Sequence, residues 1–236
     1  MESYNLNGYT TYSESNAEPL YRYTAKTFAW MFAGLLLTFL TAIAGYATGA
    51  VFYVFAVPYG HFILLLVELG VVVFLSARVH KLSVGAARTL FFAYAILNGV
   101  TFSVYFLIYD MLSLVMVFGL TSVYFGLMAM IGYFVKVDLS RMRNVLLGGA
   151  IFLAVFWVLS MFLNLSGFET IACMIGIVIF LAYTAYDTQK IKAYYEYYGN
   201  DAVMASKASV FSALALYLDF INIFIYLLRI LGKRRN

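Results

Sequence analysis

The chain has 236 residues, of which 64% are hydrophobic and only 11% are charged, and its mean hydropathy is +0.90. Soluble domains are about 45–50% apolar and about 25% charged, so this composition excludes a water-soluble globule. The single cysteine, Cys173, excludes an internal disulfide. Together with His61 and His80 it also falls short of the roughly four ligands that a structural zinc site needs.

The first twenty residues are polar and carry no basic side chain, which predicts a flexible tail rather than a secretory signal. Seven apolar stretches follow, each near the roughly 20 residues that a helix needs to cross a bilayer. In chain order they are Phe28–Gly49, Phe62–Val79, Thr89–Ile108, Leu112–Val135, Val145–Leu165, Thr170–Thr188 and Val210–Ile230. These runs are continuous rather than alternating, so they predict helices and not a β-barrel. The predicted fold is all-α, with residues 1–20 as a tail and residues 21–236 as one seven-helix transmembrane domain.

The basic residues predict the orientation of these helices. Eleven of the fifteen flank the tail or every second connection, namely Arg22, Lys26, Arg78, Lys81, Arg88, Lys136, Arg141, Arg143, Lys190, Lys192 and Lys207. The alternate connections, Ala50–His61, Tyr109–Met111 and Asn164–Glu169, hold none. Because Lys and Arg are enriched in cytoplasmic loops, the N-terminus is predicted to be cytoplasmic.

The last four basic residues, Arg229, Lys233, Arg234 and Arg235, run against this distribution if the final stretch crosses the membrane. The alternative is that the final stretch re-enters on the same side. The length of Val210–Ile230 favours a full crossing, and therefore seven spans.

Three acidic residues lie inside apolar stretches, where a charge at a helix centre costs about 2.5–3.5 kcal/mol. Glu68 is midway along the second stretch, Asp219 is midway along the seventh, and Asp187 is near the inner end of the sixth. Each also has a structural interpretation, Asp187 as an interfacial cap or as a partner of Lys190, and the other two as hydrogen-bonding groups. Asn222 shares the helix face of Asp219 three residues later.

Asp187 and Asp219 meet if the sixth helix is longer than its apolar stretch and packs beside the seventh. Two close carboxylates cannot both stay ionised at low cost, so such a pair is a candidate proton-sensitive switch. Carboxylate oxygens are also the ligands that Ca²⁺ prefers, which makes both residues candidate transient Ca²⁺ ligands. We expect no tightly bound cofactor and no nucleic-acid partner, because the basic residues follow the membrane loops. The expected partners are the lipid bilayer, Ca²⁺ and H⁺.

Four motifs together resemble the Bax inhibitor-1 family, including its bacterial members. They are the final stretch from Ala213 to Phe224 with the following Leu227–Leu231, the segment Tyr183–Ile191, the loop Lys136–Ser140 and the mid-helix Glu68. The motif in the final stretch is specific, the others are individually modest, and their order and spacing agree along the chain outside the tail.

The resemblance implies a seven-helix bundle with the last helix at its centre, and a pH-sensitive Ca²⁺ leak in which Asp187 and Asp219 form the sensor. It also implies a basic latch at the inner end of the second helix. Arg78, one position from the matching slot, is the candidate. Glu68 would lie in the ion path, with Asn222 beside it. The expected location is a bacterial plasma membrane, with an organelle membrane as the alternative.

Other functions use the same features. A proton-coupled exchanger of Ca²⁺ or another cation would employ the same acids, and a membrane regulator would transport nothing and bind other membrane proteins. An aspartyl intramembrane protease also carries two membrane aspartates. However, Tyr217-Leu218 before Asp219 departs from the glycine-containing pattern of those enzymes. We therefore expect no enzymatic activity.

Overall fold

The computed structural model describes residues 18–57, 60–78 and 81–235, and these residues are helical almost throughout. The α-helices are α1 (Leu20–Ala47), α2 (Ala50–Ala56), α3 (Gly60–Arg78), α4 (Val84–Phe102), α5 (Tyr105–Ile108), α6 (Met111–Phe134), α7 (Arg143–Ser160), α8 (Glu169–Tyr198) and α9 (Ala202–Leu231). Two short 3-10 helices, η1 (Leu139–Met142) and η2 (Ser166–Phe168), precede α7 and α8. The all-α prediction is confirmed, whereas most of the predicted tail, residues 1–17, lies outside the described residues.

Six segments are long and apolar enough to cross a membrane. They are α1, α4 continued through α5, α6, η1 with α7, η2 with α8, and α9. The chain is therefore a multi-pass integral membrane protein. The described apolar part of α3 is the shorter stretch Leu66–Leu75, so the seventh crossing stays a prediction.

Several helices extend beyond their apolar stretches. α1 begins at Leu20 rather than Phe28, α8 continues past Thr188 to Tyr198, and α9 begins at Ala202 rather than Val210. The side chain of Asp201 fixes the start of α9, because its Oδ1 accepts hydrogen bonds from the backbone N–H groups of Val203 and Met204, both at 3.0 Å. Hydropathy marks the part of a helix that lies in lipid, whereas capping groups mark where the helix ends.

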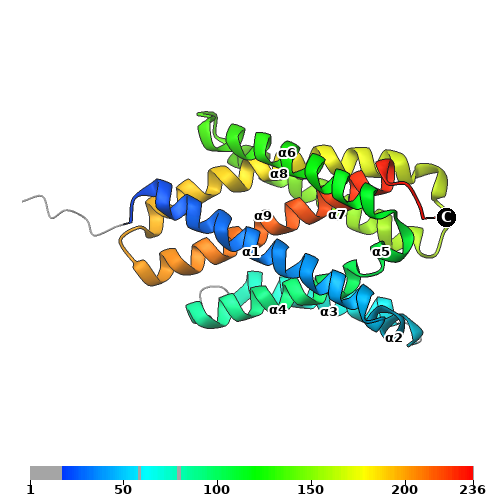
Figure 1. Cartoon of the computed structure of the whole chain (residues 1–236). Helices are drawn as coiled ribbons and strands as arrows, with labels where there is room; N and C mark the ends of the chain where they lie inside the picture. The colour runs from blue at the N-terminus through cyan, green and yellow to red at the C-terminus, as the bar shows by residue number, and fades with distance from the viewer. Residues whose placement is uncertain (1–17, 58–59, 79–80, 236) are drawn as a thin grey trace, which may run out of the picture.

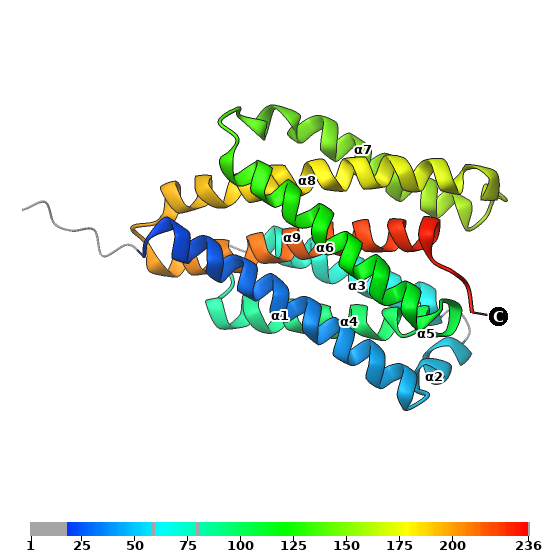
Figure 2. The same cartoon turned by 45° about the horizontal axis from the view of Figure 1, so that its top comes forward.

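Helix α9 runs through the middle of the bundle, with α1, α4, α6 and α8 packed around it (Figures 1 and 2). In its most apolar window 72% of the residues are buried, against 11–44% in the other five segments. Aromatic rings fill the contacts, and Phe224 packs on Phe39 of α1, Phe102 of α4 and Phe118 of α6. A central last helix is what the resemblance implied.

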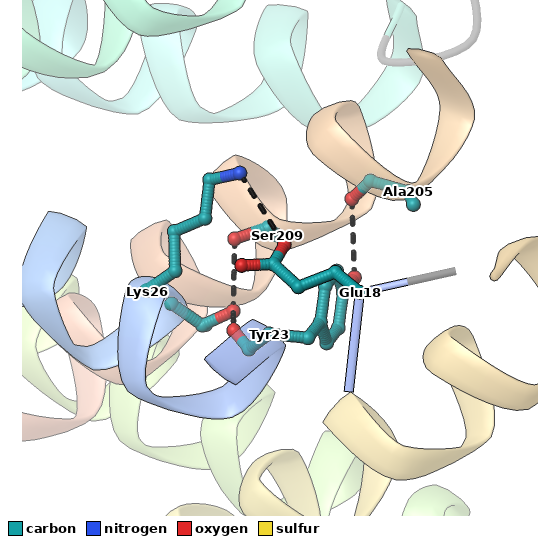
Figure 3. A network of polar contacts seen from close by, with 6 residues as sticks. Glu18, Tyr23, Lys26, Ala205 and Ser209 are labelled. Carbon is teal, nitrogen blue, oxygen red and sulfur yellow. Dashed lines mark hydrogen bonds and ion pairs between the residues drawn. The ribbon is translucent and has the colours of Figure 1, made fainter. Parts of the chain in front are cut away.

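Polar contacts fasten the start of α1 to the start of α9 (Figure 3). The Tyr23 hydroxyl donates to the Ala205 carbonyl at 3.2 Å, and the hydroxyls of Thr27 and Ser209 lie 2.8 Å apart. Lys26 and Glu18 form an ion pair at 3.6 Å. The first two contacts satisfy polar groups between α1 and α9 and fix the depth of α1 relative to α9, whereas the ion pair joins α1 to the residues just before it.

The two ends of the bundle carry different parts of the chain. The start of α1, the α6–α7 connection and the α8–α9 turn lie at one end, which we call the amino end (Figures 1 and 2). The helices α2 and α5 and the end of the chain lie at the other, which we call the carboxyl end. The two ends of the described chain therefore lie on opposite sides of the bundle.

Candidate functional site

The two predicted sensor residues lie on neighbouring helices in the interior. Asp187 is near the middle of α8 and Asp219 near the middle of α9, and only 8% and 3% of their surfaces are exposed. Helices α8 and α9 pack against each other along much of their length. The Asp219 carboxyl lies within electrostatic range of Asp187 and of Lys190. The sequence placed Asp187 near the inner end of its apolar stretch. Because α8 extends to Tyr198, Asp187 lies well inside the helix, which is the condition under which the two acids were expected to meet.

Lys190 supplies the positive charge beside this pair. Its Nζ lies 3.8 Å from Oδ1 of Asp187, one turn earlier on α8. Three aromatic rings surround the ammonium at 5.4–5.7 Å, those of Tyr186 and Tyr194 on α8 and of Phe211 on α9. The negative faces of aromatic rings attract a cation, so these rings hold Lys190 next to the two acids.

The Asp219 carboxyl is incompletely satisfied. Its Oδ2 is fully buried and accepts no hydrogen bond from the described part of the chain. An ionised carboxylate left in this state carries a penalty of several kcal/mol. A proton or a bound cation removes this penalty, so the pair with Lys190 is chemically suited to exchange one for the other.

Arg78, the candidate latch, is an exposed residue at the end of α3. Its guanidinium lies 6.0 Å from the ring centre of Phe74 on the same helix. Among the described residues the ion pair made by Asp187 is with Lys190, which is the pairing that the sequence offered as the structural interpretation of Asp187. The latch role of Arg78 stays a prediction.

Glu68 lies apart from the acid pair. Its Oε1 accepts a hydrogen bond from Thr101 of α4 at 2.5 Å, and the side chain is half-buried. Glu68 also lies within electrostatic range of Tyr217, which contacts α1 through a 2.7 Å hydrogen bond with Thr38. Asp219 follows Tyr217 by two residues, a rotation of about 200° around the helix. Glu68 and the acid pair therefore lie on different sides of α9.

Asn222 points its amide at its own helix, where Nδ2 donates to the Leu218 carbonyl at 2.8 Å. The structure thus joins Asp187 and Asp219 with Lys190. It leaves Glu68 on another side of α9, and the amide of Asn222, one turn after Asp219, is engaged with its own helix. Thr101 as the partner of Glu68 has no signal in the sequence, because the two residues belong to different helices.

A loop from the amino end is fastened to α8 beside the pair. Gln189 accepts a hydrogen bond from the Leu139 N–H and donates one to the Val137 carbonyl, both at 2.8 Å. Asp138 caps the same loop by accepting from the Ser140 N–H at 2.9 Å, and hydrogen bonds from Ser140 hold the pKa of Asp138 below its usual value. Two of the sequence motifs therefore meet here, one through Gln189 and the other through the loop.

The close approach of α6 completes the surroundings of the site. Gly132 of α6 packs against the backbone of Ala185 on α8, at a distance that leaves no room for a Cβ atom. Cys173 is a buried thiol on α8. The described residues contain no group of three or more His, Cys, Asp or Glu side chains arranged to hold a metal ion.

Residues 21–236 match the family described as "Inhibitor of apoptosis-promoting Bax1". The inner membrane protein YbhL of Escherichia coli is 37% identical over 228 residues, which cover 94% of this chain and 97% of that protein. The uncharacterized protein RP147 of Rickettsia prowazekii is 36% identical over 228 residues, 96% of each chain. A protein of Borreliella burgdorferi is 36% identical over 219 residues, 91% of this chain and 93% of its own length.

Proposed function

Because the chain belongs to the Bax inhibitor-1 family, as its motifs predicted, we propose that it is a pH-sensitive Ca²⁺ leak channel whose sensor is the pair Asp187 and Asp219. The observation that carries the proposal is that two buried acids on neighbouring helices lie within electrostatic range of each other, with the ammonium of Lys190 3.8 Å from Oδ1 of Asp187. With both acids ionised, this buried group has one negative charge in excess, and such a charge is costly away from water. Either a proton or a cation removes it.

Protons and Ca²⁺ compete for the same oxygens in this proposal. Ionised carboxylates attract Ca²⁺, whereas protonation removes the attraction and also weakens the Asp187–Lys190 ion pair. Because the acids lie on α8 and α9, a change in their charge alters the packing of the central helix. Arg78 would latch onto the pair in the closed state, and Glu68 and Asn222 would line the ion path.

We place the chain in a bacterial plasma membrane with its N-terminus in the cytoplasm. The relative YbhL of Escherichia coli is named an inner membrane protein, and eleven of the fifteen basic residues flank the tail or the connections predicted to face the cytoplasm. The bilayer, Ca²⁺ and H⁺ are then the partners that the function requires.

Ca²⁺ uptake into proteoliposomes tests the proposal, measured from about pH 6 to about pH 8, because two close carboxylates cannot both stay ionised at low cost. We expect uptake by the wild-type protein to depend on pH, and Asp219→Asn and Asp187→Asn to flatten that dependence, because an amide cannot take up the proton. Asp138→Asn, which changes an acid in the exposed loop, is the matched control and keeps the wild-type profile. Wild-type uptake equal to that of empty liposomes at every pH would reject the channel and favour the regulator.

An exchanger is the second candidate, because competition between H⁺ and Ca²⁺ at one carboxylate pair is also how coupled exchange works. The same proteoliposomes separate the two. A leak carries Ca²⁺ down its own gradient whether or not a proton gradient is present. An exchanger drives Ca²⁺ against its gradient when a proton gradient is imposed.

A further inference from the structure

An apolar groove of about 310 Å³ lies on the surface of the bundle between α1 and α6 and ends at α5. Phe39 and Phe118 close its floor, with their ring centres 4.6 Å apart, and Leu36 and Val115 are 50% and 61% exposed at its rim. Its lining is apolar throughout. Because α1 and α6 are membrane-spanning helices, the medium that fills such a groove is lipid.

A polar cavity of about 250 Å³ lies next to this groove at the carboxyl end of the bundle. Phe106 and Met111 line both spaces, and Tyr46, Asp110 and Arg235 line the polar one. The apolar groove therefore adjoins, at Phe106 and Met111, a site with a phenol, a carboxylate and a guanidinium.

The end of the chain is fixed at this polar cavity by backbone hydrogen bonds. The Arg235 N–H donates to the Ile108 carbonyl at 2.9 Å, and the Asp110 N–H donates to the Lys233 carbonyl at 3.0 Å. Arg234 pairs with Tyr109 as an antiparallel bridge between them. Residues 233–235 are thus held against the start of α6, and the side chains of these three basic residues remain exposed.

The cavity is lined by one basic and one acidic side chain, and two more basic residues precede Arg235 in the chain. Arg235 Nη1 donates to the Tyr46 hydroxyl at 2.6 Å, which orients the guanidinium over the cavity. Asp110 is the opposing acid, and its carboxylate also caps α6 by accepting from the Leu112 N–H at 3.1 Å. Arg235 and Asp110 balance each other within the cavity, and the exposed Lys233 and Arg234 just before Arg235 add two positive charges at the end of the bundle where basic residues are unexpected.

We propose that the groove and the cavity together bind one anionic phospholipid. An acyl chain lies in the groove along Phe39 and Phe118, and the phosphate accepts hydrogen bonds from Arg235 and Tyr46. A guanidinium offers paired donors that match a phosphate, and the anionic headgroup balances the excess positive charge. The site is separate from the acid pair and does not depend on the channel proposal.

Native mass spectrometry of the delipidated full chain in detergent tests this site, with dioleoyl phosphatidylglycerol and dioleoyl phosphatidylcholine as the added lipids. We expect the first phosphatidylglycerol to bind about tenfold or more tightly than phosphatidylcholine, because each basic residue near a headgroup favours the anion. The double variant Lys233→Gln/Arg235→Gln removes this preference. Val115→Trp fills the groove and weakens binding of phosphatidylglycerol while keeping every charge.

Two matched variants control the experiment. Lys136→Gln/Arg141→Gln removes the same charge at the amino end, and Val158→Trp adds the same bulk to an exposed position of α7; both keep the wild-type preference. Equal binding of the two lipids by the wild type, or equal losses in test and control variants, overturns the proposal. Binding of glycerol 1-phosphate as tight as that of the whole lipid also overturns it, because the groove would then contribute nothing.

Discussion

Gly132 lets α6 approach the backbone of α8 two residues before Asp187. A Cβ atom there would overlap the Ala185 carbonyl, which is backbone and cannot move aside on its own. We expect Gly132→Ala to lower the free energy of unfolding by about 1–3 kcal/mol, as overpacking does elsewhere. Gly119→Ala on the same helix meets open space, so it is expected to be neutral or to stabilise by about 0.5–1 kcal/mol. Thermal unfolding in detergent compares the two, and equal midpoints would contradict the close contact.

Lys190 is the second residue whose removal gives a distinctive result. Lys190→Gln leaves Asp187 buried without its cation. We expect this substitution to lower the free energy of unfolding by about 1–2 kcal/mol at about pH 8. This is less than the roughly 3–5 kcal/mol for a fully buried pair, because 30% of the Lys190 side chain is exposed. Lys136→Gln, in the exposed loop, serves as the control. The loss is expected to shrink at acid pH, where Asp187 takes up a proton. An equal loss at both pH values in unfolding experiments would show that the charge of Asp187 is not the cause.

At the scale of elements, Gln189 ties the loop Val137–Leu139 to α8 through two hydrogen bonds. Gln189→Ala removes both hydrogen bonds, and the loss of each lowers the free energy of unfolding by about 1 kcal/mol. Gln189→Glu keeps the acceptor for the Leu139 N–H and loses the donor to Val137. We expect faster amide exchange in η1 for both variants by hydrogen–deuterium exchange mass spectrometry, with alanine the faster. Exchange unchanged in both would mean that the loop is held by other contacts.

Most helices could be predicted because a long apolar run has few alternatives in a membrane. The end of α8 was predicted ten residues too early, although no glycine or proline interrupts the chain between Thr188 and Gly199. The break between α4 and α5 had no readable signal. There the Ser103 hydroxyl donates to the Val100 carbonyl at 2.5 Å, and the chain turns without glycine or proline.

The candidate site was predictable to a similar degree. Asp187 and Asp219 stand out because acids are costly in apolar segments, and the structure brings them together. The cation beside them was less clear, because Lys190 and Arg78 are both basic residues near helix ends. The sequence already offered Lys190 as a partner of Asp187, and the packing of α8 on α9, which surrounds the ammonium with Phe211 as well as two tyrosines, supports that choice.

At the scale of the whole molecule, the number of crossings determines which side each loop faces. We expect single cysteines introduced by Glu18→Cys and Ser140→Cys, in a Cys173→Ala background, to face the same compartment, because seven spans place four crossings between them. A cysteine from Ser166→Cys then faces the other compartment. Labelling of intact and permeabilised cells with a membrane-impermeant maleimide distinguishes the two compartments. If α3 does not cross, residues 18 and 140 label on opposite sides.

The central position of α9 has a consequence for how the protein is made. Translation proceeds from the N-terminus, so α1, α4, α6 and α8 enter the membrane before the helix that they surround exists. Until α9 is inserted, the faces that later bury Tyr217 and Phe224 have only lipid or one another to contact. The earlier helices are thus inserted in the membrane before they can complete their packing, because membrane helices insert and associate in separate stages. We therefore expect a chain whose synthesis stops before Ala202 to lack the most buried helix of the bundle and to leave apolar and polar faces of the other helices unpaired.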